Sequence, residues 1–341
     1  MKKYNYSKVG CQNGILQNSH DRLLHVMVLT SFLVAAAGIA QTPLAPGTIV
    51  YTDSGDAIQG GFIVSVDPQT LQETIVSTGD YLGRMGYPMG VVFDRNGQLI
   101  VANEACLLRI DPNTGEQTLI RDNQGAPGGF GSLALDGNGD ILVAAERAVL
   151  RVDALTGQMR PISSGGFFTV VLSVAVNQKG DLFVTNARYD ATSGGWVGEI
   201  IRVNPHNGRQ TIISQGGYLT FLRGIVVDGD DVYVTGMATQ DQNFGVGRVT
   251  HVDARTGIQT VVSQGDGLIC PVGIAVDATG QLIVADPYTV NPGSSTWFDG
   301  AILRINPVTG EQNIVVRGHS SVLNHCGVAV VRSLERKGNN K

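Results

Sequence analysis

The chain has 341 residues, of which 43% are hydrophobic and only 16% are charged, so it can bury a large core. Its formal net charge of −5 argues against nucleic acid as a partner, because phosphate binding needs a basic face. The 45 glycines indicate many tight turns, and no long segment after residue 40 has helical periodicity. The composition therefore predicts an all-β protein.

Residues 1–40 have the pattern of a signal peptide. Four basic residues accompany an apolar run of 18 residues, 23–40, which ends in small residues where signal peptidase cleaves. The alternative is a retained membrane anchor, because 18 apolar residues just reach the length that spans a bilayer. We expect cleavage after Ala40 and a secreted or periplasmic protein, with membrane contact only through an uncleaved signal segment.

A two-part pattern then recurs with a spacing of 41 to 54 residues. Its first part is a pair of apolar runs around an Asp-x-x-Gly turn. Its second part is an apolar run followed, in the fullest form, by Asp-x-x-Thr-Gly-x-Gln-Thr. Each part predicts a hairpin, so each repeat has four strands, which is the period of a propeller blade. The first part begins at Gly90, Ser132, Ser173, Gly224 and Gly273, and the second begins at Ser65, Arg109, Arg151, Arg202, His251 and Arg304.

The repeated turn residues have a structural explanation. An aspartate that ends a strand can accept backbone N–H groups of the following turn. A glycine in the second hairpin suits a left-handed backbone conformation. The aspartates are Asp94, Asp136, Asp228 and Asp277, and the glycines are Gly115, Gly157, Gly208, Gly257 and Gly310.

The two ends of the repeat region set the number of blades. Residues 47–51 predict a second strand without an innermost strand before it, and residues 326–331 predict an innermost strand without a second strand after it. The C-terminal strand therefore completes the first blade, and five whole blades plus this shared blade make six. Closure of the ring avoids unpaired strand edges. We predict an all-β, six-bladed β-propeller over residues 41–331 and a polar tail over 332–341.

The repeats resemble those of the six-bladed propeller superfamily of NHL-repeat proteins and the senescence-marker-protein/gluconolactonase family, and more distantly those of the seven-bladed streptogramin lyase. The resemblance implies the fold more than the function, because propellers host hydrolases, lyases and binding platforms. In gluconolactonases an Asn and an Asp before inner strands bind the metal, whereas the matching residues here are Met89 and Val272. Neither side chain offers oxygen to a hard cation. We therefore expect no cofactor, and a divalent cation in the channel is the weaker alternative.

Long connections between the second and third strands predict a binding surface. They occur in blades 4, 5 and 6, which are neighbours in the ring, so we expect one continuous wall. This wall includes Trp196, Tyr288 and Trp297, and aromatic side chains suit a ligand or partner surface. The alternative is that the aromatic side chains only hold the loops against the blades. The connections are residues 188–199, 237–246 and 287–300.

Polar residues at the ends of second strands form a possible ring around the channel mouth: Asn103, Glu146, Asn186 and Asp286. Such a ring can hold a cation or a polar ligand, or its members can cap strand ends and bond to neighbouring blades. Arg223 precedes an inner strand at a position where the other blades have uncharged residues. It suits a carboxylate or phosphate ligand, and pairing with Asp286 or another nearby carboxylate is the alternative.

Two histidines and two cysteines approach the adjacent inner strands of blades 6 and 1: His319, His325, Cys270 and Cys326. Three interpretations stay open, namely a soft metal site, a Cys270–Cys326 disulfide across the closure, and separate buried thiols. We keep His325 among the candidate ligand-binding residues.

Two functions are compatible with the sequence. The first is a monomeric, exported binding scaffold that engages a protein or small-molecule partner through the long loops of blades 4 to 6. The alternative is a lactone hydrolase or lyase that acts at the channel mouth through Arg223, Asn186, Asp286 or Glu146. The missing metal ligands favour the scaffold, and no residue is assigned a catalytic role.

Overall fold

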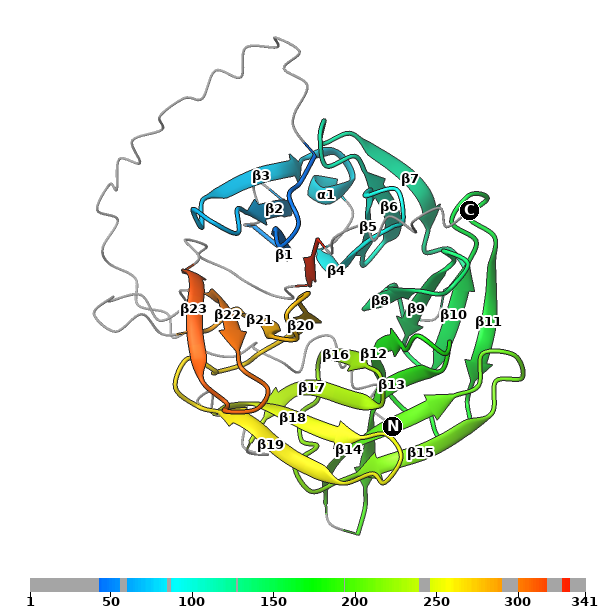
Figure 1. The fold of residues 1–341 in the computed structure, drawn as a ribbon. Helices are drawn as coiled ribbons and strands as arrows, with labels where there is room; N and C mark the ends of the chain where they lie inside the picture. Colours follow the sequence, from blue (N-terminus) through cyan, green and yellow to red (C-terminus); the bar gives the residue numbers. More distant parts are fainter. Residues whose placement is uncertain are drawn as a thin grey trace, which may run out of the picture. The chain divides into compact units, whose positions relative to one another are not determined.

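Six antiparallel sheets of four strands each surround a common centre in the computed structural model (Figure 1). The structure describes residues 43–331, apart from 56–59, 85–86, 127, 193, 239–245, 290–299 and 318–326. These residues belong to the unit Pro43–Lys341. Each sheet is one blade, and its strands are called A to D from the centre outward. The predicted six-bladed β-propeller is confirmed.

Strands A to D of the first three blades have the following bounds. Blade 1 consists of β24 (Val328–Val330), β1 (Ile49–Asp53), β2 (Phe62–Val66) and β3 (Glu73–Thr78). The short helix α1 (Asp80–Arg84) leads to blade 2, which consists of β4 (Pro88–Phe93), β5 (Leu99–Asn103), β6 (Cys106–Ile110) and β7 (Gln117–Asp122). Blade 3 consists of β8 (Leu133–Leu135), β9 (Ile141–Ala145), β10 (Ala148–Val152) and β11 (Met159–Ser164).

The other three blades follow in chain order. Blade 4 consists of β12 (Val171–Val176), β13 (Leu182–Asp190), β14 (Gly195–Val203) and β15 (Gln210–Gln215). Blade 5 consists of β16 (Ile225–Asp228), β17 (Asp231–Met237), β18 (Gly247–Asp253) and β19 (Gln259–Gln264). Blade 6 consists of β20 (Gly273–Val276), β21 (Leu282–Asp286), β22 (Ala301–Ile305) and β23 (Gln312–Arg317).

The C-terminal strand closes the ring, as predicted. β24 pairs antiparallel with β1, and Val330 lies opposite Ile49. The backbone N–H of Gly47 donates to Val331 O at 2.8 Å. The inner strands contact one another in the order β24, β4, β8, β12, β16, β20 and back to β24. The backbone groups that β1 would expose in an open ring are therefore paired.

Apolar side chains of facing sheets fill the junctions between blades. Strand B has apolar residues on both faces, because each blade packs against two neighbours, and all five residues of β9 are buried. At the junction of blades 1 and 2, Ile63, Leu99 and Leu108 belong to one fully buried cluster. Burying each such side chain stabilises the fold by about 1.5–3 kcal/mol. No helix within the described residues has the length and apolar character needed to cross a bilayer.

The repeated aspartates cap the A–B turns in blades 2, 3 and 6. Asp94, for example, accepts the N–H groups of Asn96 at 2.8 Å and Gln98 at 2.9 Å. Asp228 differs, because the A–B turn of blade 5 is shorter and Asp228 pairs directly with Asp231 in the ladder. The capping residues are Asp94, Asp136 and Asp277, with Asn177 taking the same role in blade 4.

Glycines occupy the left-handed position of the C–D turn in five blades, as predicted. Gly208 has a φ of 70°, and a Cβ there would lie 2.5 Å from Ile162 O of the preceding blade. Blade 1 has Leu71 at this position, with a φ of 59°. The glycines are Gly115, Gly157, Gly208, Gly257 and Gly310.

A glutamine at the start of strand D fastens four of the junctions between blades. In each case it donates to a serine of the preceding blade and accepts an N–H from that blade's D–A connection. Arg121 bonds to Gly157 O and Gln124 O at the junction of blades 2 and 3, where Met159 stands in place of the glutamine. The pairs are Gln117 with Ser77, Gln210 with Ser163, Gln259 with Ser214, and Gln312 with Ser263.

Candidate binding face

The D–A and B–C connections of all blades leave the strands at the same end, because consecutive strands are antiparallel. We call this end the upper face, and the end with the A–B and C–D turns the lower face. The upper face consists of the described parts of residues 79–87, 123–132, 165–170, 216–224 and 265–272, and of 54–61, 104–105, 146–147, 187–197, 238–246 and 287–300.

Asn186, in the middle of β13 of blade 4, is fully buried and anchors the loop that enters its own blade. Its Oδ1 accepts the N–H groups of Thr169 at 2.9 Å and Val170 at 3.1 Å. Its Nδ2 donates to Phe167 O at 3.2 Å and to Glu199 Oε2 at 2.7 Å. These contacts use the hydrogen-bonding capacity of the amide within the protein.

Asp286 is the counterpart of Asn186 in blade 6 and is 1% exposed. Its carboxylate accepts the N–H groups of Ile269 at 2.6 Å, Cys270 at 2.9 Å and Tyr288 at 2.9 Å. Burial raises the pKa of Asp286 to about 6, although the three amide donors act to lower it. The structure shows no ion pair between Asp286 and Arg223.

The other two predicted mouth residues differ in their surroundings. Asn103 in blade 2 is fully buried and donates through Nδ2 to Tyr81 O at 3.0 Å. Its Oδ1 is buried without a hydrogen-bond partner among the described residues. Glu146 in blade 3 is exposed, so its carboxylate is available to solvent. Three of the four predicted mouth residues are therefore buried and form hydrogen bonds to the connections between blades.

Arg223 stands at the start of the inner strand of blade 5 and is partly exposed. Its backbone N–H donates to Thr235 O at 2.9 Å, and its backbone oxygen accepts the hydroxyl of Thr185 at 3.2 Å. Within the described part of the chain, its guanidinium forms no hydrogen bond and no ion pair. The backbone of Arg223 is therefore fixed on both sides, while its charge is left for solvent or a ligand.

The B–C hairpin of blade 4 extends beyond those of blades 2 and 3. β13 and β14 each have nine residues, and their outer ends pair Tyr189 with Trp196. The two rings meet edge to face, with centroids 5.6 Å apart, and Tyr189 is 53% exposed. By contrast, Tyr288 in blade 6 is only 9% exposed, so it adds little to the surface.

Exposed aromatic side chains occur on the upper face only, as far as the described residues are concerned. Three of them follow the end of strand D at equivalent positions, where the N–H of each is held by a glutamine of the next blade. Sequence reasoning missed this group, although the Gln of the repeat was its signal. The five residues are Tyr81, Tyr87, Phe167, Tyr189 and Tyr218.

Several predicted site residues lie outside the described residues: Trp297, His325 and Cys326. Cys270 is buried, and a bridge to Cys326 stays one of the three open interpretations. Among the residues that the structure describes, no three His, Cys, Asp or Glu side chains are grouped so that they could hold a metal ion.

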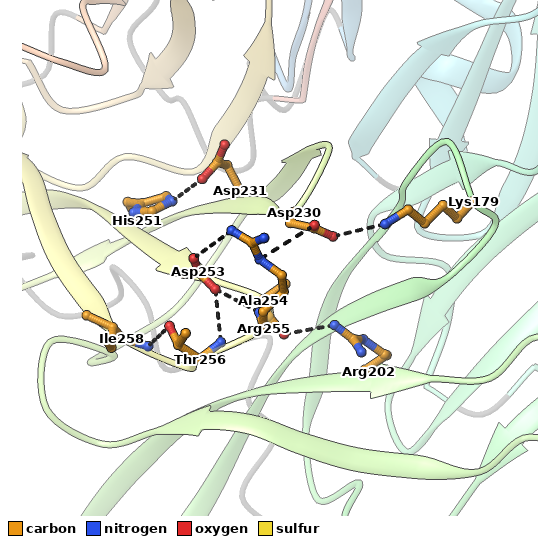
Figure 2. Close-up of polar contacts among 10 residues, drawn as sticks. All are labelled: Lys179, Arg202, Asp230, Asp231, His251, Asp253, Ala254, Arg255, Thr256 and Ile258. Carbon is orange, nitrogen blue, oxygen red and sulfur yellow. Dashed lines mark hydrogen bonds and ion pairs between the residues drawn. The ribbon is translucent and has the colours of Figure 1, made fainter.

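The lower face of blade 5 contains a network of paired charges (Figure 2). Asp230 pairs with Lys179 of blade 4 at 3.4 Å and with Arg255 at 3.7 Å. The ring of His251 lies 2.7 Å from the carboxylate of Asp231. Arg202 of blade 4 donates to the backbone oxygen of Ala254 nearby. Two of these side chains, Lys179 and Arg202, thus join blade 4 to blade 5, unlike the guanidinium of Arg223 on the upper face.

No protein-family model matches the chain, and no curated protein matches it in sequence. A chain in the crystal structure of the nidogen/laminin complex is similar, with a TM-score of 0.63 and 15% identity, over 84% of this chain and 99% of that chain. TolB from Acinetobacter baumannii is similar as well, with a TM-score of 0.59 and 14% identity, over 85% of this chain and 68% of that chain. At such identities the likeness concerns the fold alone, and it agrees with the closed ring of blades: this chain is a six-bladed β-propeller.

Proposed function

We propose that this chain is an exported, NHL-type propeller without catalytic function, which binds a protein partner on its upper face. The observation that carries the proposal is that the five exposed aromatic side chains among the described residues all lie on this face. Tyrosine, tryptophan and arginine are the residues that most often supply binding energy at protein interfaces. Export is supported by the signal-peptide pattern of residues 1–40.

The polar contacts also favour binding over chemistry at the channel mouth. Asn186 and Asp286, two of the four residues named for the hydrolase or lyase alternative, are engaged by backbone groups of the adjoining loops. The structural relative from the nidogen/laminin complex comes from an assembly of proteins, which is consistent with a protein partner for this propeller too.

The proposal can be tested by comparing variants of the two faces. One variant carries Tyr189→Ser, Trp196→Ser and Tyr218→Ser on the upper face. The matched control carries Leu155→Ser, Ile258→Ser and Val308→Ser in the C–D turns, where these side chains are 90%, 65% and 91% exposed. The wild type and both variants are immobilised and exposed to the extracellular and periplasmic proteins of the producing cell, and the retained proteins are quantified by mass spectrometry.

We expect a protein that the wild type and the lower-face control retain equally and that the upper-face variant loses. Equal retention by both variants would contradict the proposal. All six side chains are at least partly exposed, so we expect the variants to fold. Circular dichroism and the melting temperature of each variant establish that the loss of binding does not come from unfolding.

A further inference from the structure

We propose that the upper face recognises an acidic segment of its protein partner, with a carboxylate of that segment bound by Arg223. This inference rests on the proposed function and specifies its chemistry. It starts from a comparison of all arginines whose side chains the structure describes.

Arg223 is the exception among the arginines that are buried or partly exposed. Seven others of this kind, within the described residues, each have a hydrogen bond or an ion pair to the protein. Those described arginines that, like Arg223, lack a partner belong to the exposed residues, as Arg209 does. The seven partnered arginines are Arg109, Arg121, Arg151, Arg188, Arg202, Arg248 and Arg304.

A guanidinium that is partly withdrawn from water without a partner costs free energy unless a ligand or water replaces the lost contacts. The propeller forms without a charged residue at this position in its other blades, where the described counterparts are Met89, Gly131, Leu172 and Val272. The backbone of Arg223 is fixed, and its planar guanidinium has N–H donors without partners in the protein. Such a group suits a carboxylate, which arginine can bind through two parallel hydrogen bonds.

The surroundings of Arg223 join it to the long hairpin of blade 4. Thr185, whose hydroxyl bonds to Arg223 O, immediately precedes Asn186 at the base of that hairpin. Arg188 lies in the same strand and donates through Nε to Glu199 Oε1 at 2.9 Å. The hairpin then ends in the Tyr189–Trp196 pair. A continuous stretch of backbone therefore runs from the channel mouth to the exposed aromatic tip.

Around the hairpin, the other described charged side chains already have partners in the protein, so the guanidinium of Arg223 is the charge left for an acidic group, although the whole chain has a net charge of −5. Arg248 is 8% exposed, donates to Gln264 Oε1 at 2.8 Å and lies 5.2 Å from the ring centre of Tyr218, so its charge is engaged within the protein. Glu199 is 1% exposed and already accepts bonds from Asn186 and Arg188. Asp190, at the hairpin tip, accepts the N–H of Thr192.

A protein segment fits these features better than a small anion does. A free phosphate or carboxylate would use Arg223 alone, whereas an extended acidic segment can also place an apolar side chain against Tyr189 and Trp196. Arginine and aromatic side chains on one surface are the combination found at interface hot spots.

The test uses two labelled short peptides on the intact mature protein, one of alternating glutamate and tyrosine and one in which glutamine replaces glutamate. Binding is measured by fluorescence anisotropy for the wild type, Arg223→Gln, Trp196→Ser and the control Arg209→Gln, whose side chain is exposed on the lower face. We expect the wild type to bind the glutamate peptide about tenfold more tightly than the glutamine peptide, because a charge-assisted bidentate contact is lost in the latter. Arg223→Gln should remove this difference in affinity, and Arg209→Gln should preserve it. Trp196→Ser should weaken the binding of both peptides.

Equal affinities of the wild type for the two peptides, or an Arg223→Gln variant that still distinguishes them, would overturn the inference. Displacement of the peptide by millimolar inorganic phosphate, with no effect of Trp196→Ser, would replace it with a small-anion site. If the glutamine peptide binds as well as the glutamate peptide and Trp196→Ser abolishes both, the inference fails while the proposed function stands. If neither peptide binds, the inference fails, and the comparison of upper-face and lower-face variants decides the proposed function separately.

Discussion

Gln210 of blade 4 donates its side-chain amide to Ser163 Oγ of blade 3 over 2.9 Å, across the junction between the two blades. The same side chain accepts the N–H of Phe167 at 2.7 Å, and Ser163 donates onward to Gly208 O at 2.8 Å. One glutamine therefore fixes the strand of one blade, the turn of the next and the loop that presents an exposed aromatic ring.

Replacing this glutamine should weaken the junction. Gln210→Ala leaves the N–H of Phe167 without its acceptor and removes the amide donor to Ser163 Oγ and Gly165 O. We expect a loss of about 1–3 kcal/mol in the free energy of unfolding. The control is Gln158→Ala, since Gln158 is exposed. Urea denaturation of both variants measures the effect, and equal stabilities would show that the junction does not depend on this contact.

Leu71 predicts a stabilising substitution. It has a φ of 59° and is 44% exposed, at a position where the other five blades have glycine. Leu71→Gly keeps the left-handed backbone but removes the steric cost of a Cβ there, which is about 1–2 kcal/mol. The greater entropy of glycine in the unfolded chain offsets part of this gain. We expect a small rise in melting temperature. The reverse change, Gly208→Leu, should lower it, because its Cβ would lie 2.5 Å from Ile162 O. A lower melting temperature for Leu71→Gly would refute this explanation.

Asp286 predicts a pH dependence of stability. Its pKa of about 6 in the folded protein is higher than the ordinary value of 3.8, because the carboxyl is buried. The folded state thus holds its proton more tightly than the unfolded state, so this group stabilises the fold below about pH 4 and loses that contribution as the pH rises to about 6. The contribution is on the order of 2–3 kcal/mol.

The variant Asp286→Asn isolates this effect, since the asparagine cannot titrate. We expect the stability of the wild type relative to the variant to be greater at pH 4 than at pH 7, as measured by denaturant unfolding across that range. A difference that is independent of pH, or that grows as the pH rises, would contradict the prediction.

Closure of the ring predicts unequal effects of two C-terminal deletions. Removing residues 326–341 deletes β24 and leaves the inner edge of β1 unpaired, so we expect aggregation or loss of cooperative unfolding. Removing only the polar tail, 332–341, should leave the melting temperature unchanged. Differential scanning calorimetry separates the two, and a longer deletion that stays monomeric with the melting temperature of the full protein would disprove the role of closure.

The repeat pattern in the sequence predicted the blades, their number and the closing strand, because those features follow from local turns and apolar periodicity. Gly208 and its counterparts were predictable for the same reason. The fastening role of Gln210 was not predicted, although its recurrence was visible, because its partner Ser163 belongs to another blade. Contacts of this kind depend on how blades stack, and one sequence does not reveal that geometry.

The candidate site was predictable in part. Arg223 stood out because its counterparts carry no charge, and the lack of a partner became visible only in three dimensions. Asp286 ends β21 as the sequence predicted, whereas Asn186 lies in the middle of β13, which continues to Asp190. The backbone partners of both residues, such as Val170 and Cys270, lie in loops whose paths the sequence does not define.

The upper face as a binding surface is tested most directly by photo-crosslinking in the producing cell. A photoreactive phenylalanine analogue is placed at Tyr189 in one version of the protein and at Leu155 in another, both of which are exposed. We expect a discrete crosslinked protein from position 189 and none from position 155, and Arg223→Gln should weaken the former. Crosslinks to the same protein from position 155, with none from position 189, would contradict the account.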